Sequence, residues 1–257
     1  MSTATIHRWH DGALELLDYC DMAETTIEAA DSWFVTDGRT LALGLHRERF
    51  LSAVDGRVDA EAFWEAAVAL IPREGDWFPR VELQLSRGSL LLVFRLRSAP
   101  ERTESVVLTT HRGPDPRTVP AIKGPDLERM THLRTEAQAQ GAGELVILSP
   151  DGFVIDGGYS ALVWWRGAIL CAPPLDFERV DSVTARSLLG LAEAVGIETW
   201  REAVTPAELD GTEIWSLNAL HGPRIVTTWI DGPGVAELPG RLRLWRDKLA
   251  VLRRPIG

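Results

Sequence analysis

Three strand-like segments joined by short turns constrain the fold of this chain most. They are RVELQLS (80–86), SLLLVFRLR (89–97) and ESVVLTT (104–110), which turn at Arg87-Gly88 and Ala99-Pro100. This spacing predicts a meander of neighbouring strands. Strand-like and helix-like segments elsewhere do not alternate regularly, so the sequence predicts an α+β fold rather than a doubly wound sheet.

Two more strand-like segments precede the meander. Residues 32–36 and 41–45 flank the turn Asp37-Gly38, a pair of residues common in hairpin turns. Helices are predicted after them over 46–54 and 60–71, the second ended by a proline. The first part of the chain is thus predicted to be a mixed domain of helices and strands.

The stretch HRGPDPRTVP (111–120) contains three prolines and one glycine among polar residues. This composition is typical of a linker. We therefore predict a smaller N-terminal α+β domain over 1–112, a linker over 113–120 and a larger C-terminal domain over 121–257.

The larger domain is predicted to be a compact, largely antiparallel barrel with attached helices. Its short strand-like runs turn at Pro150-Asp151-Gly152 and Arg166-Gly167. Trp164-Trp165 lies on one of these strands, where alternate side chains face opposite sides, so at least one ring is predicted on an outer or partner-facing surface. The other predicted elements are helices at 125–140 and 184–195 and strands at 213–218 and 224–230.

The composition excludes several classes of function. The 27 basic and 37 acidic residues give a formal net charge of −10, which argues against nucleic acid or an anionic membrane as a partner. No apolar run has the length of a signal-peptide core or a membrane span. The two cysteines, Cys20 and Cys171, are too few for a disulfide framework or a zinc site. We expect a cytoplasmic protein with buried, reduced thiols and no bound metal.

Lysine is rare in this chain. Only two of the 27 basic residues are lysines, Lys123 and Lys248, and arginine cannot form a Schiff base because it stays protonated. Lys123 lies in VPAIKGPDLERM, at the end of a predicted strand and just before a predicted helix that Gly124-Pro125 marks. A helix N-terminus would lower the pKa of this amine. The sequence allows either such a nucleophilic lysine or an ordinary solvated one.

Two other motifs could bind a ligand. Asp181-Ser182-Val183-Thr184 precedes an apolar helix, where free N–H groups either cradle a phosphate or are capped by Ser182 or Asp181. Asp156-Gly157-Gly158 lies in a strand-rich stretch. Paired glycines there indicate either a bulge with a ligand against the backbone or a tight turn.

Taken in order, these motifs resemble the fold-type IV pyridoxal-phosphate family, which includes the class IV aminotransferases and aminodeoxychorismate lyase. The resemblance is carried by IKGPDLERM (122–130), SVTARSLLGLAEAVGIE (182–198) and TEIWSLNALHGPRIVTTWIDG (212–232), and more faintly by DGRTLALGLHRERF (37–50). It implies a two-domain class IV aminotransferase-like fold, with a smaller N-terminal and a larger barrel-like C-terminal domain. It also implies the cofactor pyridoxal 5'-phosphate, a small-molecule amino substrate and a homodimer.

The resemblance also assigns roles to single residues. Lys123 would form the Schiff base with the cofactor and then act as the acid–base group. Asp156 would hold the proton of the pyridine nitrogen, which keeps the ring an electron sink. Arg49 would bind the phosphate. The remaining phosphate contacts would come from one helix start and one turn, which supply Ser182, Val183, Thr184, Asn218 and Ala219.

Several residues differ from the family's pattern. Asp156 stands where glutamate is usual. The family's usual asparagine, cofactor-facing tyrosine or arginine, glycine and threonine correspond to Ala161, Leu127, Ser182 and Ala219. These differences leave open a degenerate homologue that binds the cofactor without turnover.

One short segment bears on the reaction. LNALHG (217–222) resembles the Asn-Ala/Ser-Leu stretch of aminodeoxychorismate lyases more than the Gly-Thr-Ala of branched-chain transaminases. The resemblance therefore favours the lyase, which converts 4-amino-4-deoxychorismate to 4-aminobenzoate and pyruvate in folate synthesis. The alternative is a branched-chain or D-amino-acid transaminase of the same family.

Overall fold

The computed structural model describes residues 4–17 and 25–257, which form two compact units. Unit 1 comprises Met1–Arg102, Ile122–Leu127 and Leu252–Gly257, and unit 2 comprises Thr103–Ala121 and Glu128–Val251. Unit 1 is therefore built from three separate segments of the chain. The domain boundaries expected from the sequence stay a prediction.

A five-stranded antiparallel sheet forms the centre of unit 1, in the order β2-β1-β8-β7-β3. Both predicted strands of the β7–β8 hairpin are confirmed, and its turn residues Arg87 and Gly88 have the positive φ angles of 48° and 80° that such turns require. The strands are β1 (Ala4–His10), β2 (Ala13–Leu16), β3 (Thr25–Ser32), β7 (Arg80–Ser86) and β8 (Ser89–Arg97).

The third strand of the predicted meander does not pair with the second. It is β9 (Ser105–Thr110), which belongs to the sheet of unit 2 and pairs with β10 and β16. The edge of β8 that does not pair with β7 pairs with β1. The meander prediction was wrong here because an N-terminal strand, distant in sequence, takes the position that β9 was expected to fill.

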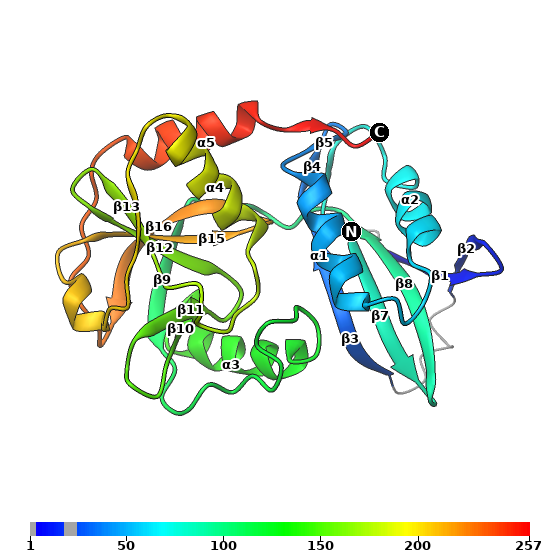
Figure 1. Ribbon diagram of the computed structural model, residues 1–257, viewed down its shortest axis with the longest axis horizontal. Helices are drawn as coiled ribbons and strands as arrows, with labels where there is room; N and C mark the ends of the chain where they lie inside the picture. Colours follow the sequence, from blue (N-terminus) through cyan, green and yellow to red (C-terminus); the bar gives the residue numbers. More distant parts are fainter. Residues whose placement is uncertain (1–3, 18–24) are drawn as a thin grey trace. The chain divides into compact units, whose positions relative to one another are not determined.

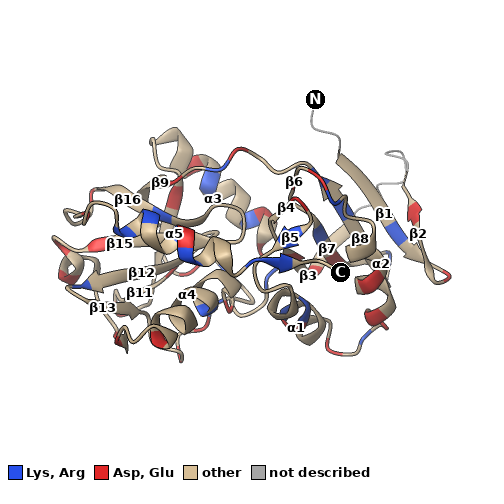
Figure 2. Ribbon diagram, turned by 90° about the horizontal axis from the view of Figure 1, so that it is seen from above, with Lys and Arg blue, Asp and Glu red and all other residues tan. Residues whose placement is uncertain are grey.

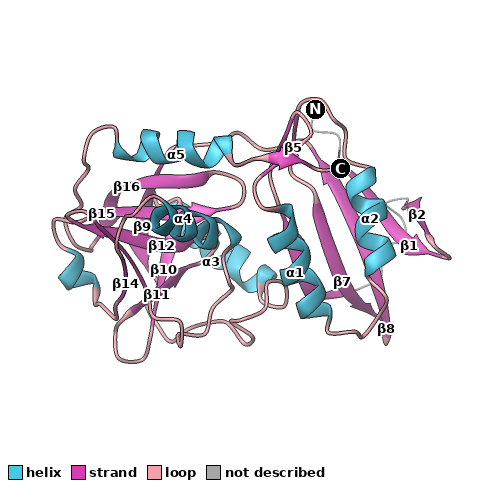
Figure 3. Ribbon diagram, turned by 45° about the horizontal axis from the view of Figure 1, so that its top comes forward, coloured by secondary structure: helices cyan, strands magenta, loops and turns pink. Residues whose placement is uncertain are grey.

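Two helices, α1 (Leu43–Val54) and α2 (Glu61–Ala69), pack on the sheet of unit 1 (Figure 3). The predicted strand at 41–45 was wrong, because Ala42 adopts a left-handed conformation (φ 50°) and the helix begins at Leu43. A small second sheet has the order β17-β5-β4-β6, formed by Arg254–Pro255, Arg39–Thr40, Val35–Thr36 and Asp76–Trp77. The core under the helices contains the fully buried rings of Trp33, Phe50, Phe63, Trp64 and Phe94.

Unit 2 is organised around a curled, half-barrel sheet of eight strands (Figure 1). Its order is β11-β10-β9-β16-β15-β12-β13-β14. Three neighbouring pairs are parallel, so the sheet is mixed rather than largely antiparallel as expected. The further strands are β10 (Glu144–Leu148), β11 (Val154–Gly157), β12 (Ala161–Arg166), β13 (Ile169–Ala172), β14 (Thr199–Arg201), β15 (Glu213–Asn218) and β16 (Gly222–Ile230).

The helices of unit 2 cover this sheet. α4 (Val183–Ala194) contacts β12 and β15, and α5 (Arg241–Val251) contacts β16 (Figure 1). α3 (Leu127–Ala139) buries Met130 and Ala137 against Leu145 and Ile147 of β10. A short 3-10 helix covers Pro206–Leu209.

Trp164 and Trp165 are both buried, with 0% and 5% of their surfaces exposed. The expected outward-facing ring was therefore wrong for this chain. Trp165 points to the second face of the sheet, but that face is covered, because the ring packs against Trp215 and against Trp245 of α5.

Basic and acidic residues are interspersed along the elements, as α5 illustrates (Figure 2). Within the described ranges 4–17 and 25–257, no helix is long and apolar enough to cross a membrane, and no group of three acidic, histidine or cysteine side chains could hold a metal ion. Cys171 is a buried free thiol, as expected, whereas Cys20 lies outside the described residues.

Candidate active site

The sequence predicted Lys123 at the end of a strand. In the structure it lies instead along the edge of β3. The amide of Ala30 donates a hydrogen bond to the carbonyl of Lys123 at 2.6 Å. At Gly124, whose φ is 148°, an added Cβ would come within 2.8 Å of the backbone Cα of Ala29. The lysine is therefore fixed by backbone contacts to the sheet, and glycine is required after it because the two backbones touch.

Gly124→Ala is expected to displace the lysine. The clash with backbone atoms and the positive φ should destabilise the folded state by about 1–3 kcal/mol, the usual cost of overpacking. Gly44→Ala in α1 is the matched control, because nothing lies within 4 Å of an added Cβ there. Urea unfolding of the two variants checks the prediction, and equal stability of both would contradict it.

Beside this edge, Asp31 gathers three donors in the core of unit 1. Nδ1 of His46 lies 2.8 Å from Oδ1 of Asp31, Nε of Arg49 donates to Oδ2 at 2.7 Å, and Nη2 of Arg49 donates to Oδ1 at 2.9 Å. Burial alone would raise the pKa of Asp31, but the charges and hydrogen bonds of Arg49 and His46 outweigh it and hold that pKa well below its usual range. Asp31 is therefore an anion that fixes the orientation of Arg49.

The pKa of the Lys123 amine is lowered towards neutral pH. Burial first, and then the charge of Arg49, lower the pKa of Lys123 to about 8, although the charge of Asp31 acts in the opposite direction. The charges of Arg80 and Arg97 add to the lowering. The sequence attributed a low pKa to a helix N-terminus, but α3 begins only at Leu127. Burial and arginine charges are causes that the linear motif did not reveal.

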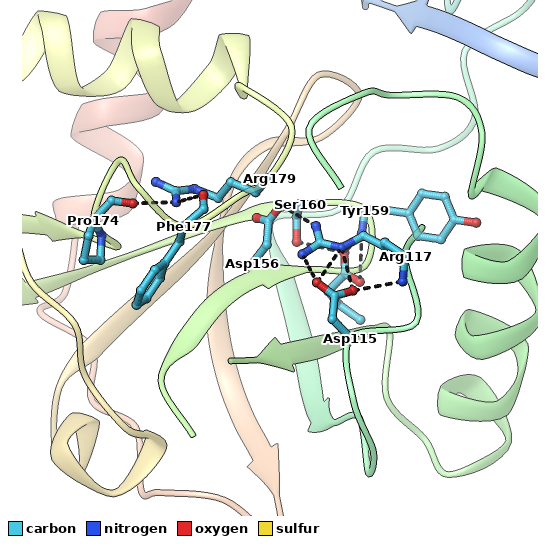
Figure 4. Close-up of polar contacts among 9 residues, drawn as sticks. Asp115, Arg117, Asp156, Tyr159, Ser160, Pro174, Phe177 and Arg179 are labelled. Atoms are coloured by element: carbon cyan, nitrogen blue, oxygen red, sulfur yellow. Dashed lines mark hydrogen bonds and ion pairs between the residues drawn. The ribbon is translucent and has the colours of Figure 1, made fainter. Parts of the chain in front are cut away.

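Within unit 2, Asp156 on β11 is a buried carboxylate (Figure 4). Its Oδ2 lies 3.6 Å from Nη1 of Arg117, and its Oδ1 is buried without a hydrogen-bond partner. Burial raises the pKa of Asp156 to about 7, although the charges of Arg117 and Arg179 oppose the rise. A carboxyl group with this pKa is partly protonated near neutral pH, so it can donate or accept a proton there.

The glycine pair after Asp156 forms a tight turn, the second of the two alternatives that the sequence allowed. The amide of Gly157 donates to the carbonyl of Ser160 at 2.7 Å, and an added Cβ at Gly157 would come within 2.5 Å of the Ser160 hydroxyl. Glu144 fixes this turn, because its carboxylate accepts from the Ser160 hydroxyl at 2.8 Å and lies 3.3 Å from the amide of Tyr159. The turn thereby fixes the strand end that carries Asp156.

The other residues that the sequence predicted to contact the phosphate lie in unit 2. Ser182 is the N-cap of α4, and its hydroxyl accepts from the amide of Ala185 at 3.3 Å. Val183 and Thr184 form the first turn of that helix, and both are buried. Asn218 ends β15 and accepts from the amide of His221 through Oδ1 at 2.8 Å, closing the turn that contains Ala219. Capping by Ser182, which the sequence offered as an alternative, is thus present.

Comparison with known proteins then decides the family. The family described as "Amino-transferase class IV" matches residues 28–229, well over half of the 257-residue chain. The chain belongs to the class IV aminotransferases. Membership of this family makes the protein a pyridoxal-phosphate-dependent enzyme, as the sequence predicted. A search of curated proteins found no match.

Solved structures share the fold of this class IV aminotransferase. A fold IV transaminase from Curtobacterium pusillum has a TM-score of 0.81 at 19% identity, over 97% of this chain and 99% of the other. A branched-chain aminotransferase from Thermoproteus uzoniensis, in complex with norvaline, has 0.80 at 17%, over 98% and 100%. A hypothetical aminotransferase from Mycobacterium tuberculosis in its PLP-bound form has 0.73 at 18%, over 97% and 98%. The predicted α+β, two-part fold of the family is therefore confirmed.

Sequence reasoning missed several residues that surround the predicted ones in this aminotransferase. His46 is three residues before Arg49 on α1, and this helical spacing could have indicated that both side chains face one partner. That partner is Asp31, a lone acidic residue at the end of a strand. Glu144 similarly precedes an apolar run on β10. For Arg117, within the proline-rich segment, no local pattern gave a signal.

The residues of the aminotransferase fit its cofactor. A lysine whose pKa is lowered to about 8 can condense with an aldehyde. The unpartnered, buried Oδ1 of Asp156 suits a pyridine N–H. The orientation of Arg49 is fixed by Asp31, as a phosphate-binding arginine requires.

Proposed function

We propose that this protein is an aminodeoxychorismate lyase in which Lys123 bonds the cofactor and moves the proton. When bound, pyridoxal phosphate supplies an electron sink for the carbon next to the substrate's amine. The low pKa of Lys123 is the observation that supports its role most strongly, because about a tenth of the amine is neutral at pH 7 when its pKa is about 8. That neutral amine can both condense with an aldehyde and accept a proton at Nζ.

Other side chains of this chain would bind and orient the cofactor. Asp156 would accept the pyridine N–H through Oδ1. Arg49 would bind the phosphate, because the Asp31 carboxylate holds its guanidinium in one orientation. The remaining phosphate contacts would come from Ser182 and the amides of Val183 and Thr184, and from the turn at Asn218 and Ala219.

The choice of the lyase over the transaminase rests on the Leu217–Gly222 segment. Conversion of aminodeoxychorismate to 4-aminobenzoate and pyruvate needs no second substrate, whereas a transaminase needs an amino acceptor. In the structure, Asn218 accepts a hydrogen bond from the amide of His221, so the Asn-Ala-Leu residues form a closed turn.

The purified protein loaded with pyridoxal phosphate is expected to release pyruvate from aminodeoxychorismate without an added 2-oxo acid, at a rate proportional to enzyme. A coupled lactate dehydrogenase assay measures the pyruvate. Conversion of the bound cofactor to its amine form by D- or L-amino acids, without pyruvate from aminodeoxychorismate, would instead identify a transaminase. A protein that turns yellow with added cofactor but converts neither aminodeoxychorismate nor amino acids would identify the degenerate homologue, whereas a colourless protein that ignores added cofactor would contradict the proposal. The homodimer and the cytoplasmic location stay predictions from the resemblance and the sequence.

A further inference from the structure

Arg117 links two carboxylates inside unit 2 (Figure 4). Only 7% of its side chain is exposed. Its Nη2 donates to Oδ2 of Asp115 at 2.7 Å and its Nε donates to Oδ1 at 2.9 Å, a two-pronged pair. Its Nη1 lies 3.6 Å from Oδ2 of Asp156. The side chain comes from the proline-rich segment 111–120, for which the sequence offered only a linker role.

The two-pronged pair fixes the plane of the guanidinium. Since Asp115 holds Nε and Nη2, the group that remains toward Asp156 is Nη1. The attraction is one-sided, because it acts on Oδ2 of Asp156 while Oδ1 stays buried without a hydrogen-bond partner. Arg117 thus distinguishes the two oxygens of one carboxylate.

We propose that Arg117, braced by Asp115, is a positioning residue for Asp156: it holds Oδ2 and favours the ionised carboxylate, so that Oδ1 is the oxygen left to accept the pyridine N–H of the cofactor. The cofactor half of this proposal rests on the proposed function. The ion-pair half concerns this chain alone.

The other charges around Asp156 are consistent with this role. Arg179 is a second cation near Asp156, but its guanidinium is held by the backbone carbonyls of Pro173, Pro174 and Phe177. Glu144 acts in the opposite direction and helps to raise the pKa of Asp156. Burial is the largest cause of that raised pKa, which is about 7. Asp156 is therefore near half-ionised at neutral pH, where the loss of one neighbouring cation has a large effect.

The test compares Arg117→Met and Arg117→Lys with Arg112→Met. Arg112 lies in the same segment, but it is exposed, and its Nη2 donates to the exposed Asp231 at 3.1 Å. The pKa of Asp156 is measured in the cofactor-free protein from the carboxyl carbon signals of labelled aspartate, assigned with Asp156→Asn. Arg117→Met should raise the pKa of Asp156 by about one pH unit or more, since an opposite charge at this distance lowers a carboxyl pKa by about 1–3. Arg117→Lys should restore most of the difference, and Arg112→Met should leave the value unchanged.

A second readout is the affinity for pyridoxal phosphate. At pH 6 the Kd of Arg117→Met should be about tenfold above the wild-type value for a pKa rise of about one unit, because a smaller fraction of its Asp156 is ionised, and the difference should shrink as the pH rises above both pKa values, where both carboxyls are ionised. An unchanged pKa of Asp156 in Arg117→Met, or an equal rise in Arg112→Met, overturns the proposal. If Arg117→Met does not fold, the wild-type titration decides, because a value above about 9 would mean that Arg117 does not favour the ionised carboxylate. If the wild-type protein binds no cofactor, the proposed function fails, while the titration still tests the ion pair.

Discussion

Lys123→Ala is expected to abolish covalent attachment of pyridoxal phosphate and to lower kcat at least about 10³-fold, because one amine both bonds the cofactor and moves the proton. The wild-type protein treated with cofactor and borohydride should carry a stable label on the peptide that contains Lys123. Mass spectrometry of the digested protein measures the label. Folding should be preserved, because the contacts that fix this segment to β3 come from the backbone.

The composition of the chain provides an unusual control for that experiment. Lys248, in the last turn of α5, is the only other lysine, so Lys248→Ala removes every alternative lysine at once. This variant should keep the label and the activity. Lys123→Arg tests the chemistry separately, because it keeps a positive charge but stays protonated. A label that persists in Lys123→Ala would exclude Lys123 as the attachment site.

Asp156→Asn is expected to lower activity and to raise the stability of the cofactor-free protein. Activity should fall about 10²-fold or more, because an amide does not supply the charge that holds a pyridine N–H. Stability should change in the opposite direction, because burial raises the pKa of the folded-state carboxyl from 3.8 to about 7. Between these two pH values the folded state holds the proton more tightly than the unfolded chain, so the wild-type protein loses stability as the pH rises.

Asp156→Asn removes that loss. At pH 8 the variant should be more stable than the wild type by about 2–4 kcal/mol, and the difference should approach zero near pH 4. Urea unfolding at several pH values measures it. Asp151→Asn, in the exposed hairpin before β11, is the control and should have no such pH dependence. An Asp156→Asn protein less stable than the wild type at pH 8 would show that the carboxylate is paired well enough to stabilise the fold.

Local patterns predicted the elements that depend on neighbouring residues. The β7–β8 hairpin follows from alternating apolar residues and a turn dipeptide, and α4 begins where Ser182 can cap it. One prediction failed because a distant segment decides the outcome: β1 occupies the edge expected for β9. Another failed locally, because the left-handed Ala42 starts a helix where a strand was expected.

The same distinction applies to the candidate site. Lys123 could be identified from its sequence context and from the scarcity of lysine, and Asp156 from the paired glycines after it. The reasons for their altered pKa values could not be predicted, because burial, the main cause for both residues, and the charge of Arg49 near Lys123 depend on segments distant in sequence. Asp31 and Glu144 are similar cases, since each carboxylate acts by holding a group elsewhere in its unit. The sequence drew attention to Lys123 and Asp156, but not to the buried residues that contact their surroundings.

The attachment of the Lys123 segment to β3 has a consequence for dissecting this protein. β3 is the last strand of its sheet, and unpaired edge strands recruit strands from other molecules. A fragment ending before the proline-rich segment would lack residues 122–127, and with them the backbone that contacts Ala29 and Ala30. Such a truncation would expose the unpaired edge of β3 and favour aggregation. The stretch that presents the reactive amine therefore also shields the first part of the chain from self-association.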